Sequence, residues 1–344
     1  MKVNSSLMTT LTSPHDLLSA VPFLVGYHPT NSLVVIALVD ESIGMAMRID
    51  FPADCDSDQI DALATHLGQE SADGALIVAY LPDEVDSAEF LLAPLQEAIS
   101  IRGVAIRECL VVHKNRWRST ICTDQSCCPP EGSAMPDIES SRISAEQVAA
   151  GKPMPFAGEK ELFDSLSATE VDAQLITELR KVPAIAYTSD NVVELQRQGA
   201  LAVNDLVKEF AEKGIVKDKK LLAFVLVRLH DVQVRDYAMG ITDEENADTL
   251  QSLWRWLMRT APAGYVAPVA TLFAASSYEL GDGAMAHRAL QRALDDDSRY
   301  PLAKLLRRVF AAGWPPAQFT EMRADLHPKV CALLFPHDTP EQAS

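Results

Sequence analysis

The sequence predicts an N-terminal mixed-sheet domain of the α/β or α+β class, followed by an all-α domain of helical hairpins that is partly tetratricopeptide-like. Segments typical of strands and of helices alternate along residues 1–121, whereas every regular pattern after about residue 159 is helical. The residues between these regions are rich in proline and cysteine, as expected of a boundary. We therefore expect a mixed-sheet domain at 1–121, a connector at 122–158, a helical domain at 159–325 and a tail at 326–344.

The first domain is predicted to begin with a helix and to continue as a sheet. Ser13 can cap this helix, Pro14 suits its first turn, and Asp16 has the position of a capping-box acid. Residues 32–39 form a nearly unbroken apolar run that predicts a strand buried on both faces. Residues 44–51 alternate in polarity and predict its hairpin partner. The elements expected next are helix 57–68, strand 75–81, helix 87–100 and a hairpin of strands 109–113 and 117–121.

The second domain is predicted to be entirely helical. Residues 267–312 have the pattern of one and a half tetratricopeptide units, with a tight turn at residues 281–283 and small residues such as Ala286 and Ala293 on the following helix. An ordinary helical hairpin with an alanine-rich contact explains the same pattern, and the sequence leaves both possibilities open. The helices are expected at about 159–167, 170–181, 191–213, 218–238, 246–260, 267–280, 283–295 and 301–312.

Charge and composition exclude several classes of protein. The chain has 30 Lys and Arg against 48 Asp and Glu, for a formal net charge of −18, so we expect neither general nucleic-acid binding nor an anionic membrane surface as its partner. We expect no signal peptide and no membrane span, because apolar runs are short and interrupted, and we place the protein in the cytoplasm. A local basic excess in the last helices could meet an acidic partner, although a solvated helical face is the simpler interpretation. It comprises Arg288, Arg292, Arg299, Lys304, Arg307, Arg308 and Arg323, against Asp295, Asp296, Asp297 and Glu321.

Three cysteines close together form the first candidate site. Thiolates of Cys122, Cys127 and Cys128 have a spacing that can bind zinc, and Cys109 and His113 on the preceding strand are possible further ligands. The alternative is that these small side chains pack an irregular loop, because free cysteine is among the most buried residue types. The spacing does not match the C-x-x-C motif of redox proteins.

The second candidate site combines a loop with the second strand. Tyr27 and His28 lie in the loop before the first strand, where a histidine can act as a general base or contact a ligand, or can simply bond to a turn. Arg48 and Asp50 share one face of the second strand, where they either line a pocket or form a solvated charged stripe. Farther along the chain, Asp231 and Arg235 have the spacing of an ion pair on a helix surface.

Several sequence segments resemble a known family. They are SPHDLLSAVPFLVGYHPTNSLVVIAL, the cysteine-containing stretch at residues 117–132, VRDYAMG at 234–240, and LFAASSYELGDGAMAHRALQRAL at 272–294. Together they resemble a bacterial family known only as a domain of unknown function, number 4192, over about residues 10–325. The resemblance implies no activity or cofactor. It marks as signature positions Cys122, Cys127, Cys128, Pro129, Glu131 and Gly132.

Two functions from different classes follow from these observations. The chain has no G-x-G-x-x-G, G-x-x-x-x-G-K-[ST], H-E-x-x-H or G-x-S-x-G motif, and its helical array favours a non-catalytic binding or adaptor protein with a protein partner at the concave face. The alternative is an enzyme or small-ligand binder with a site between the sheet and the connector, with structural zinc as a further option. Its candidate ligand-binding residues are Tyr27, His28, Arg48, Asp50 and Glu131.

Overall fold

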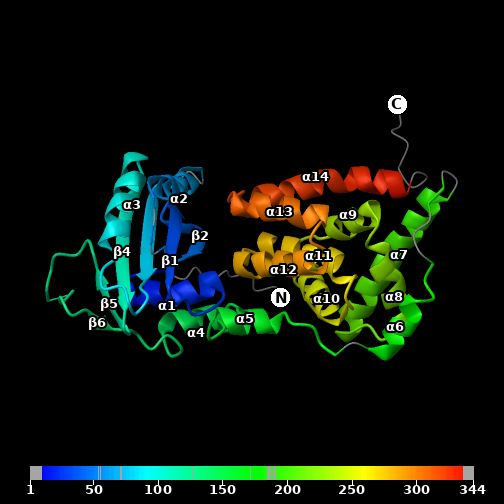
Figure 1. Ribbon diagram of the computed structural model, residues 1–344, viewed down its shortest axis with the longest axis horizontal. Helices are drawn as coiled ribbons and strands as arrows, with labels where there is room; N and C mark the ends of the chain where they lie inside the picture. The colour runs from blue at the N-terminus through cyan, green and yellow to red at the C-terminus, as the bar shows by residue number, and fades with distance from the viewer. Residues whose placement is uncertain are drawn as a thin grey trace, which may run out of the picture. The chain divides into compact units, whose positions relative to one another are not determined.

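The chain folds into two compact units, Met1–Leu162 and Phe163–Ser344, in a computed structural model (Figure 1). The first unit contains a mixed sheet with helices and the second contains only helices, so the predicted fold class is confirmed for the described residues. The structure describes residues 10–52, 54, 56–69, 72–126, 128–170, 172–183, 187–188 and 191–335.

The first unit is built on a six-stranded sheet in the order β2-β1-β3-β4-β5-β6. Neighbouring strands are antiparallel except for β3 and β4, which are parallel and connected through α3. The strands are β1 (Ser32–Val39), β2 (Ser42–Asp50), β3 (Gly74–Tyr80), β4 (Ala105–His113), β5 (Arg116–Ser119) and β6 (Ser133–Ala134). The helices are α1 (Pro14–Val25), α2 (Ser57–Gln69), α3 (Glu89–Ile101) and α4 (Arg142–Ala149), and α5 (Glu159–Ser165) spans the division between the units.

Both faces of the sheet are covered. Leu33, Val35 and Ala37 of β1 join a core with α2 and α3, whereas the intervening Val34 and Ile36 are fully buried on the opposite face. On that opposite face α1 packs, with the ring of His15 edge-on to Trp117 at 5.3 Å. A strand buried on both faces has no polar side to alternate with, which explains the continuous apolar run of β1.

Much of the predicted connector belongs to the first unit. β6 pairs with the edge of the sheet, and Tyr27 forms a bridge with Phe156, so the segment folds back onto the strands and loops that precede it. Gly132 has a φ of +75° and lies so close to β5 that a Cβ would be 2.9 Å from the Trp117 carbonyl oxygen. Only glycine fits such a position, which gives this signature residue a structural reason.

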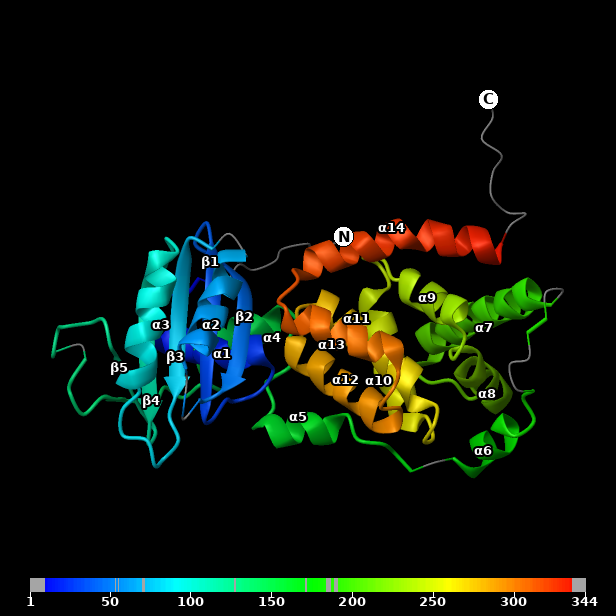
Figure 2. The same cartoon turned by 45° about the horizontal axis from the view of Figure 1, so that its top comes forward.

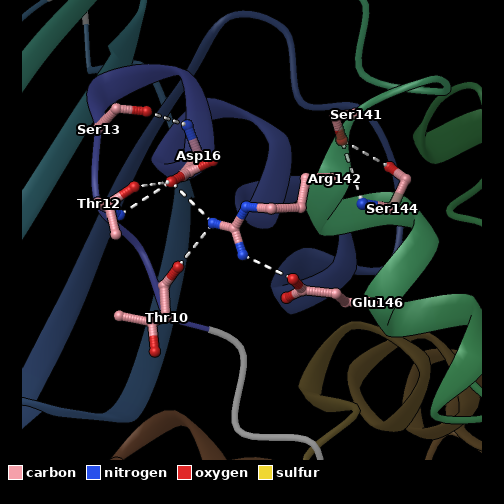
Figure 3. Close-up of polar contacts among 8 residues, drawn as sticks. All are labelled: Thr10, Thr12, Ser13, Asp16, Ser141, Arg142, Ser144 and Glu146. Carbon is pink, nitrogen blue, oxygen red and sulfur yellow. Dashed lines mark hydrogen bonds and ion pairs between the residues drawn. The ribbon is translucent and has the colours of Figure 1, made fainter.

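An ion pair attaches α4 to the start of α1 (Figure 3). The Ser13 hydroxyl accepts a hydrogen bond from the Asp16 N–H, as expected for the cap, but Asp16 accepts from the N–H and hydroxyl of Thr12 at 2.9 and 2.7 Å. Arg142 donates to Asp16 at 2.9 Å and to the Thr10 carbonyl at 2.8 Å. Burial acts to raise the pKa of Asp16, but the hydrogen bonds from Thr12 and Arg142 outweigh it and lower the pKa.

The substitution Asp16→Asn is expected to lower the free energy of unfolding by about 1–2 kcal/mol, since it removes the charge that Arg142 and Thr12 share. The pKa of Asp16 is lowered in the folded state, so its stabilisation is present above the ordinary aspartate pKa of about 3.9 and is lost as the pH falls through the folded pKa. Urea unfolding at pH 7 and pH 3 checks this. The exposed Glu84 supplies the control, Glu84→Gln, and an equal loss in both variants would contradict the role of the ion pair.

The second unit consists of helices that pack against one another (Figure 2). The predicted helix at residues 218–238 is two helices, because Asp231 caps a new one by accepting from the N–H groups of Gln233 and Val234. The predicted pair of Asp231 with Arg235 is wrong, since Arg235 pairs with Asp236 at 2.6 Å. The helices are α6 (Ala173–Leu179), α7 (Val192–Lys213), α8 (Lys219–Arg228), α9 (Val232–Gly240), α10 (Ala247–Thr260), α11 (Val266–Glu279), α12 (Gly283–Asp296), α13 (Pro301–Ala311) and α14 (Pro316–Leu334).

The last helix was not predicted. α14 lies along α9 and α7 and includes residues 326–334, which the sequence places in a tail (Figure 2). Prolines at residues 315, 316 and 328 argue against a helix when only the sequence is considered. In the structure Pro316 occupies the favourable first helical position, and the helix continues through Pro328. Residues 336–344 of the predicted tail lie outside the described residues.

Candidate functional site

The predicted residues Tyr27, Arg48 and Asp50 come together in the first unit. Arg48 lies opposite Val34 and Asp50 lies opposite Ser32, so both share the face of the sheet that α1 covers in part. The Arg48 guanidinium is 2.8 Å from Asp50 and 5.8 Å from the centre of the Tyr27 ring.

The charge of Arg48 is already neutralised within this cluster. Its Nε donates to the Ser32 hydroxyl at 2.9 Å, and its Nη1 lies 3.7 Å from Glu159 as well as close to Asp50. Burial raises the pKa of Tyr27 to about 12, although the Arg48 charge acts to lower it. Tyr27 is therefore neutral at physiological pH and is suited to packing rather than to proton transfer.

His28 and Glu131 are placed differently. The His28 N–H donates to the Phe156 carbonyl at 3.0 Å, and burial lowers the pKa of its ring while Glu139 acts to raise it. Glu131 is exposed, and its backbone carbonyl accepts a hydrogen bond from the Arg116 side chain on β5 at 2.8 Å. The His28 bond is made by the main chain, so the role of the His28 ring, whether as base, ligand contact or cap of a turn, stays a prediction.

The cysteines do not converge among the described residues. Cys109 is fully buried in the core beneath α3, and burial raises the pKa of its thiol. His113 follows it by four residues on the same strand, which separates their Cα atoms by about 13 Å. Zinc ligands lie only about 2.0–2.3 Å from the metal, so Cys109 and His113 do not share one ion.

The remaining predicted ligands lie in the loop after β5. Cys122 and Cys128 are half-buried, and the Cys122 N–H donates to the Ser119 hydroxyl at 3.1 Å. Cys127 lies outside the described residues. Within the part of the chain that the structure describes, no three His, Cys, Asp or Glu side chains are grouped closely enough to hold a metal.

α11 and α12 form the expected helical hairpin, which fits both a tetratricopeptide-like unit and an ordinary hairpin, and α11 has no open face. α9, α10, α12, α13 and α14 all pack against α11, and its residues from Val266 to Tyr278 are all buried. α11 itself therefore offers no exposed face to a partner, and the expectation that a partner binds the concave face of the helical array stays a prediction.

Two surface clefts in the second unit lie beside α6 and α8. The first has a volume of about 310 Å³ and an apolar lining of Leu175, Ile215, Val216, Leu222 and Trp256. The second has a volume of about 500 Å³ and an apolar lining of Val182, Pro183, Leu221 and Phe224. α8 contributes to both, but Lys219 and Leu222 line the first cleft and Lys220, Leu221 and Phe224 line the second, from different sides of the helix. We call the pair the α6–α8 clefts.

Charged side chains surround the apolar lining of both clefts. Asp172 pairs with Lys219 at 2.8 Å, and Glu178 pairs with Lys181 at 2.7 Å. Asp218 caps α8 by accepting from the N–H groups of Lys220 and Leu221. Among the described residues, the ammonium groups of Lys217 and Lys220 form no ion pair, so each cleft keeps one unpaired cation.

The sequence-based predictions do not include the α6–α8 clefts, although one feature of the sequence indicates an apolar surface there. Trp254 and Trp256 are two residues apart on α10, and side chains at that spacing on a helix point to different sides. Trp254 is 1% exposed in the core, whereas Trp256 is half-buried and lines the first cleft. Two large aromatic residues at this spacing indicate a second apolar surface besides the core.

Comparison with known proteins places the chain in one family. No helix among the described residues is long and apolar enough to cross a membrane. Neither the curated proteins nor the solved structures contain a match to the chain. The family model of DUF4192, a domain of unknown function, matches residues 14–317, which include the sheet and the helices through the start of α14. The chain therefore belongs to the DUF4192 family.

Proposed function

We propose that this protein is a non-catalytic binding or adaptor protein of the cytoplasm whose helical unit receives a segment of a protein partner in the α6–α8 clefts. The observation that carries the proposal is the pair of clefts with partly apolar lining on different sides of α8. Ile215 and Trp256 in the first cleft, and Val182, Pro183, Leu221 and Phe224 in the second, remain at least partly exposed, and exposed apolar side chains are typical of surfaces that bind other proteins.

The charges around the clefts suit a partner with a particular pattern. Lys217 and Lys220 form no ion pair among the described residues, and Asp172 and Glu178 are paired with other lysines. Glu170 also lines the first cleft and Asp218 the second, so each cleft is lined by two acids and two lysines. A short segment with an apolar anchor and polar residues of both signs would suit the mixed lining of either cleft. We favour a protein segment over a small metabolite because both clefts lie at the surface of the helical unit and combine exposed apolar side chains with charges of both signs.

Two surface variants test the proposal against a matched control. Ile215→Glu places a charge in the first cleft at a side chain that is 42% exposed, and Lys220→Glu reverses the unpaired charge of the second. Leu305→Glu is the control, since Leu305 is 56% exposed on α13 and lines neither cleft. Partners captured with the wild-type chain are purified, and their affinities for each variant are measured by calorimetry.

Each cleft variant is expected to weaken binding of a true partner at least about tenfold, which corresponds to about 1.4 kcal/mol, while the control binds as the wild type does. Binding that survives both cleft variants would place the partner elsewhere and reject these clefts. Failure to capture any specific partner would count against the adaptor function itself.

A small-ligand site at the sheet is the second hypothesis. The observation in its favour is that Tyr27, Arg48 and Asp50 meet in one cluster. The Arg48 charge is already shared by two carboxylates, which leaves no free cation for a ligand to bind. We therefore give it second place to the helical clefts.

A further inference from the structure

Four arginines of the second unit form a cluster between two helices. Arg255 and Arg259 lie one turn apart on α10, and Arg288 and Arg292 lie one turn apart on α12, so each pair shares a helix face. Arg292 reaches across to donate to the Met258 carbonyl at 3.1 Å. All four side chains are half-buried, and we refer to them as the arginine cluster.

The four charges repel one another. Burial lowers the pKa of Arg255 and of Arg292, and the charge of Arg259 lowers both further. Arg288 adds to the effect on Arg292. Positive charges this close to one another disfavour the cluster, and anions nearby reduce that repulsion.

The carboxylates nearest to the cluster are engaged by backbone groups. Asp282, which faces Arg255, accepts from the Met285 N–H at 3.0 Å as the cap of α12. Asp296, which faces Arg292, accepts from the backbone N–H groups of Gly264, Val266 and Ala267 at 2.6, 2.9 and 3.0 Å. Within the described part of the chain, none of the four arginines forms an ion pair with a carboxylate.

Neutral groups accept hydrogen bonds from only some of the guanidinium nitrogens of the arginine cluster. Arg255 donates to the Ser165 hydroxyl at 3.1 Å, and Arg259 donates to the Ser167 carbonyl at 3.3 Å. Arg288 lies over the Phe163 ring at 4.2 Å.

Two buried donors of the cluster remain unused. The Nε of Arg255 and the Nη1 of Arg292 are buried and have no hydrogen-bond partner among the described residues. A buried donor without an acceptor costs about 1–3 kcal/mol, and more for a charged group. Both nitrogens are shielded from solvent, so an anion from outside the chain would bind at the exposed parts of the half-buried guanidinium groups to which they belong.

We propose that the arginine cluster binds a phosphate group, carried by a small phosphate monoester or present as inorganic phosphate. A phosphate carries about two negative charges at pH 7 and offers several acceptor oxygens, which match planar guanidinium groups that approach from two helices. A single carboxylate would leave more of the positive charge unneutralised. The proposal does not depend on the protein-binding function of the α6–α8 clefts.

Calorimetric titration of the full chain tests the proposal with inorganic phosphate, glucose 6-phosphate and acetate at constant ionic strength. The variants Arg255→Gln and Arg292→Gln are compared with Arg299→Gln, because Arg299 is exposed and lies outside the cluster. We expect saturable binding of inorganic phosphate, no binding of acetate, and about tenfold weaker phosphate binding for each cluster variant but not for Arg299→Gln. Tighter binding of glucose 6-phosphate would identify a monoester as the ligand, and equal or weaker binding would identify the free anion.

A second measurement requires no variant and so does not depend on folding of the substituted chains. Phenylglyoxal modifies accessible arginines, and mass spectrometry reports the extent at each one. We expect phosphate to protect Arg255, Arg259, Arg288 and Arg292 but not Arg299. Equal modification with and without phosphate, or phosphate binding unchanged in both cluster variants, would overturn the proposal and leave the cluster a purely structural role.

Discussion

Replacing Glu279 with alanine is expected to lower the free energy of unfolding by about 3–5 kcal/mol. The Arg323 guanidinium on α14 lies 2.6 Å from the Glu279 carboxylate on α11, and their side chains are only 6% and 9% exposed. Arg323 also donates to the carbonyls of Gly240 and Thr242 at 3.2 and 2.8 Å. Loss of the carboxylate leaves a buried guanidinium with neutral partners only, and α14 loses its main polar attachment to the unit.

The double variant Glu279→Leu with Arg323→Leu is expected to cost clearly less than Glu279→Ala alone. Burial raises the pKa of Glu279 more than the Arg323 hydrogen bond lowers it, so the carboxylate is disfavoured at this position even with its partner. Because the pKa of Glu279 is higher in the folded than in the unfolded chain, the contribution of this carboxyl to the free energy of unfolding falls as the pH rises from about 4.3, the ordinary glutamate pKa, toward the folded-state pKa. The pair thus specifies where α14 packs more than it adds to net stability.

Urea unfolding at neutral pH measures both variants, and hydrogen exchange of the α14 amides shows whether the helix detaches. A single variant that loses less than about 1 kcal/mol would show that water reaches Arg323 and that the ion pair is not buried in solution. A double variant as unstable as the single one would show that the leucines do not pack in place of the pair.

Replacing Phe273 with alanine is expected to be comparably severe, with a loss of about 3–5 kcal/mol. Phe273 is 1% exposed at the middle of α11, the helix on which five others pack. Removing its ring takes away buried apolar surface and leaves a cavity that rigid neighbouring helices cannot close.

Leu280→Ala is the matched control for Phe273→Ala, because Leu280 ends the same helix and is 45% exposed. Its loss should stay within about 0.5 kcal/mol, as is usual for surface positions. Thermal and urea unfolding report both variants. Similar losses at the two positions would contradict the central position of α11.

Local patterns explain how much of the fold was predictable. The apolar run of residues 32–39 and the alternation in residues 44–51 match β1 and β2 closely, because burial on two faces or on one leaves a direct pattern in the chain. The division of residues 218–238 into α8 and α9 was missed. It depends on whether Asp231 caps a helix or pairs with Arg235, and both are local possibilities for that side chain.

The site was harder to predict than the fold. The sequence groups Tyr27, His28, Arg48, Asp50 and Glu131 as ligand-binding candidates. The register of β1 and β2 places Arg48 and Asp50 on one face, and Tyr27 packs on Arg48 from the loop before β1. The same reasoning placed Cys109 and His113 in one possible zinc site, which the extended geometry of β4 prevents. The α6–α8 clefts and the arginine cluster join helices that are far apart in the chain, so no spacing in the sequence indicates them.

By itself the sequence determined the fold class, the order of most elements and the family resemblance, because hydrophobic periodicity and capping act over a few residues at a time. Only the tertiary structure decided that α11 is enclosed, that Arg48 is neutralised and that four arginines lack carboxylate partners. Burial and charge compensation depend on the neighbours that folding assembles, and those neighbours come from distant parts of the chain.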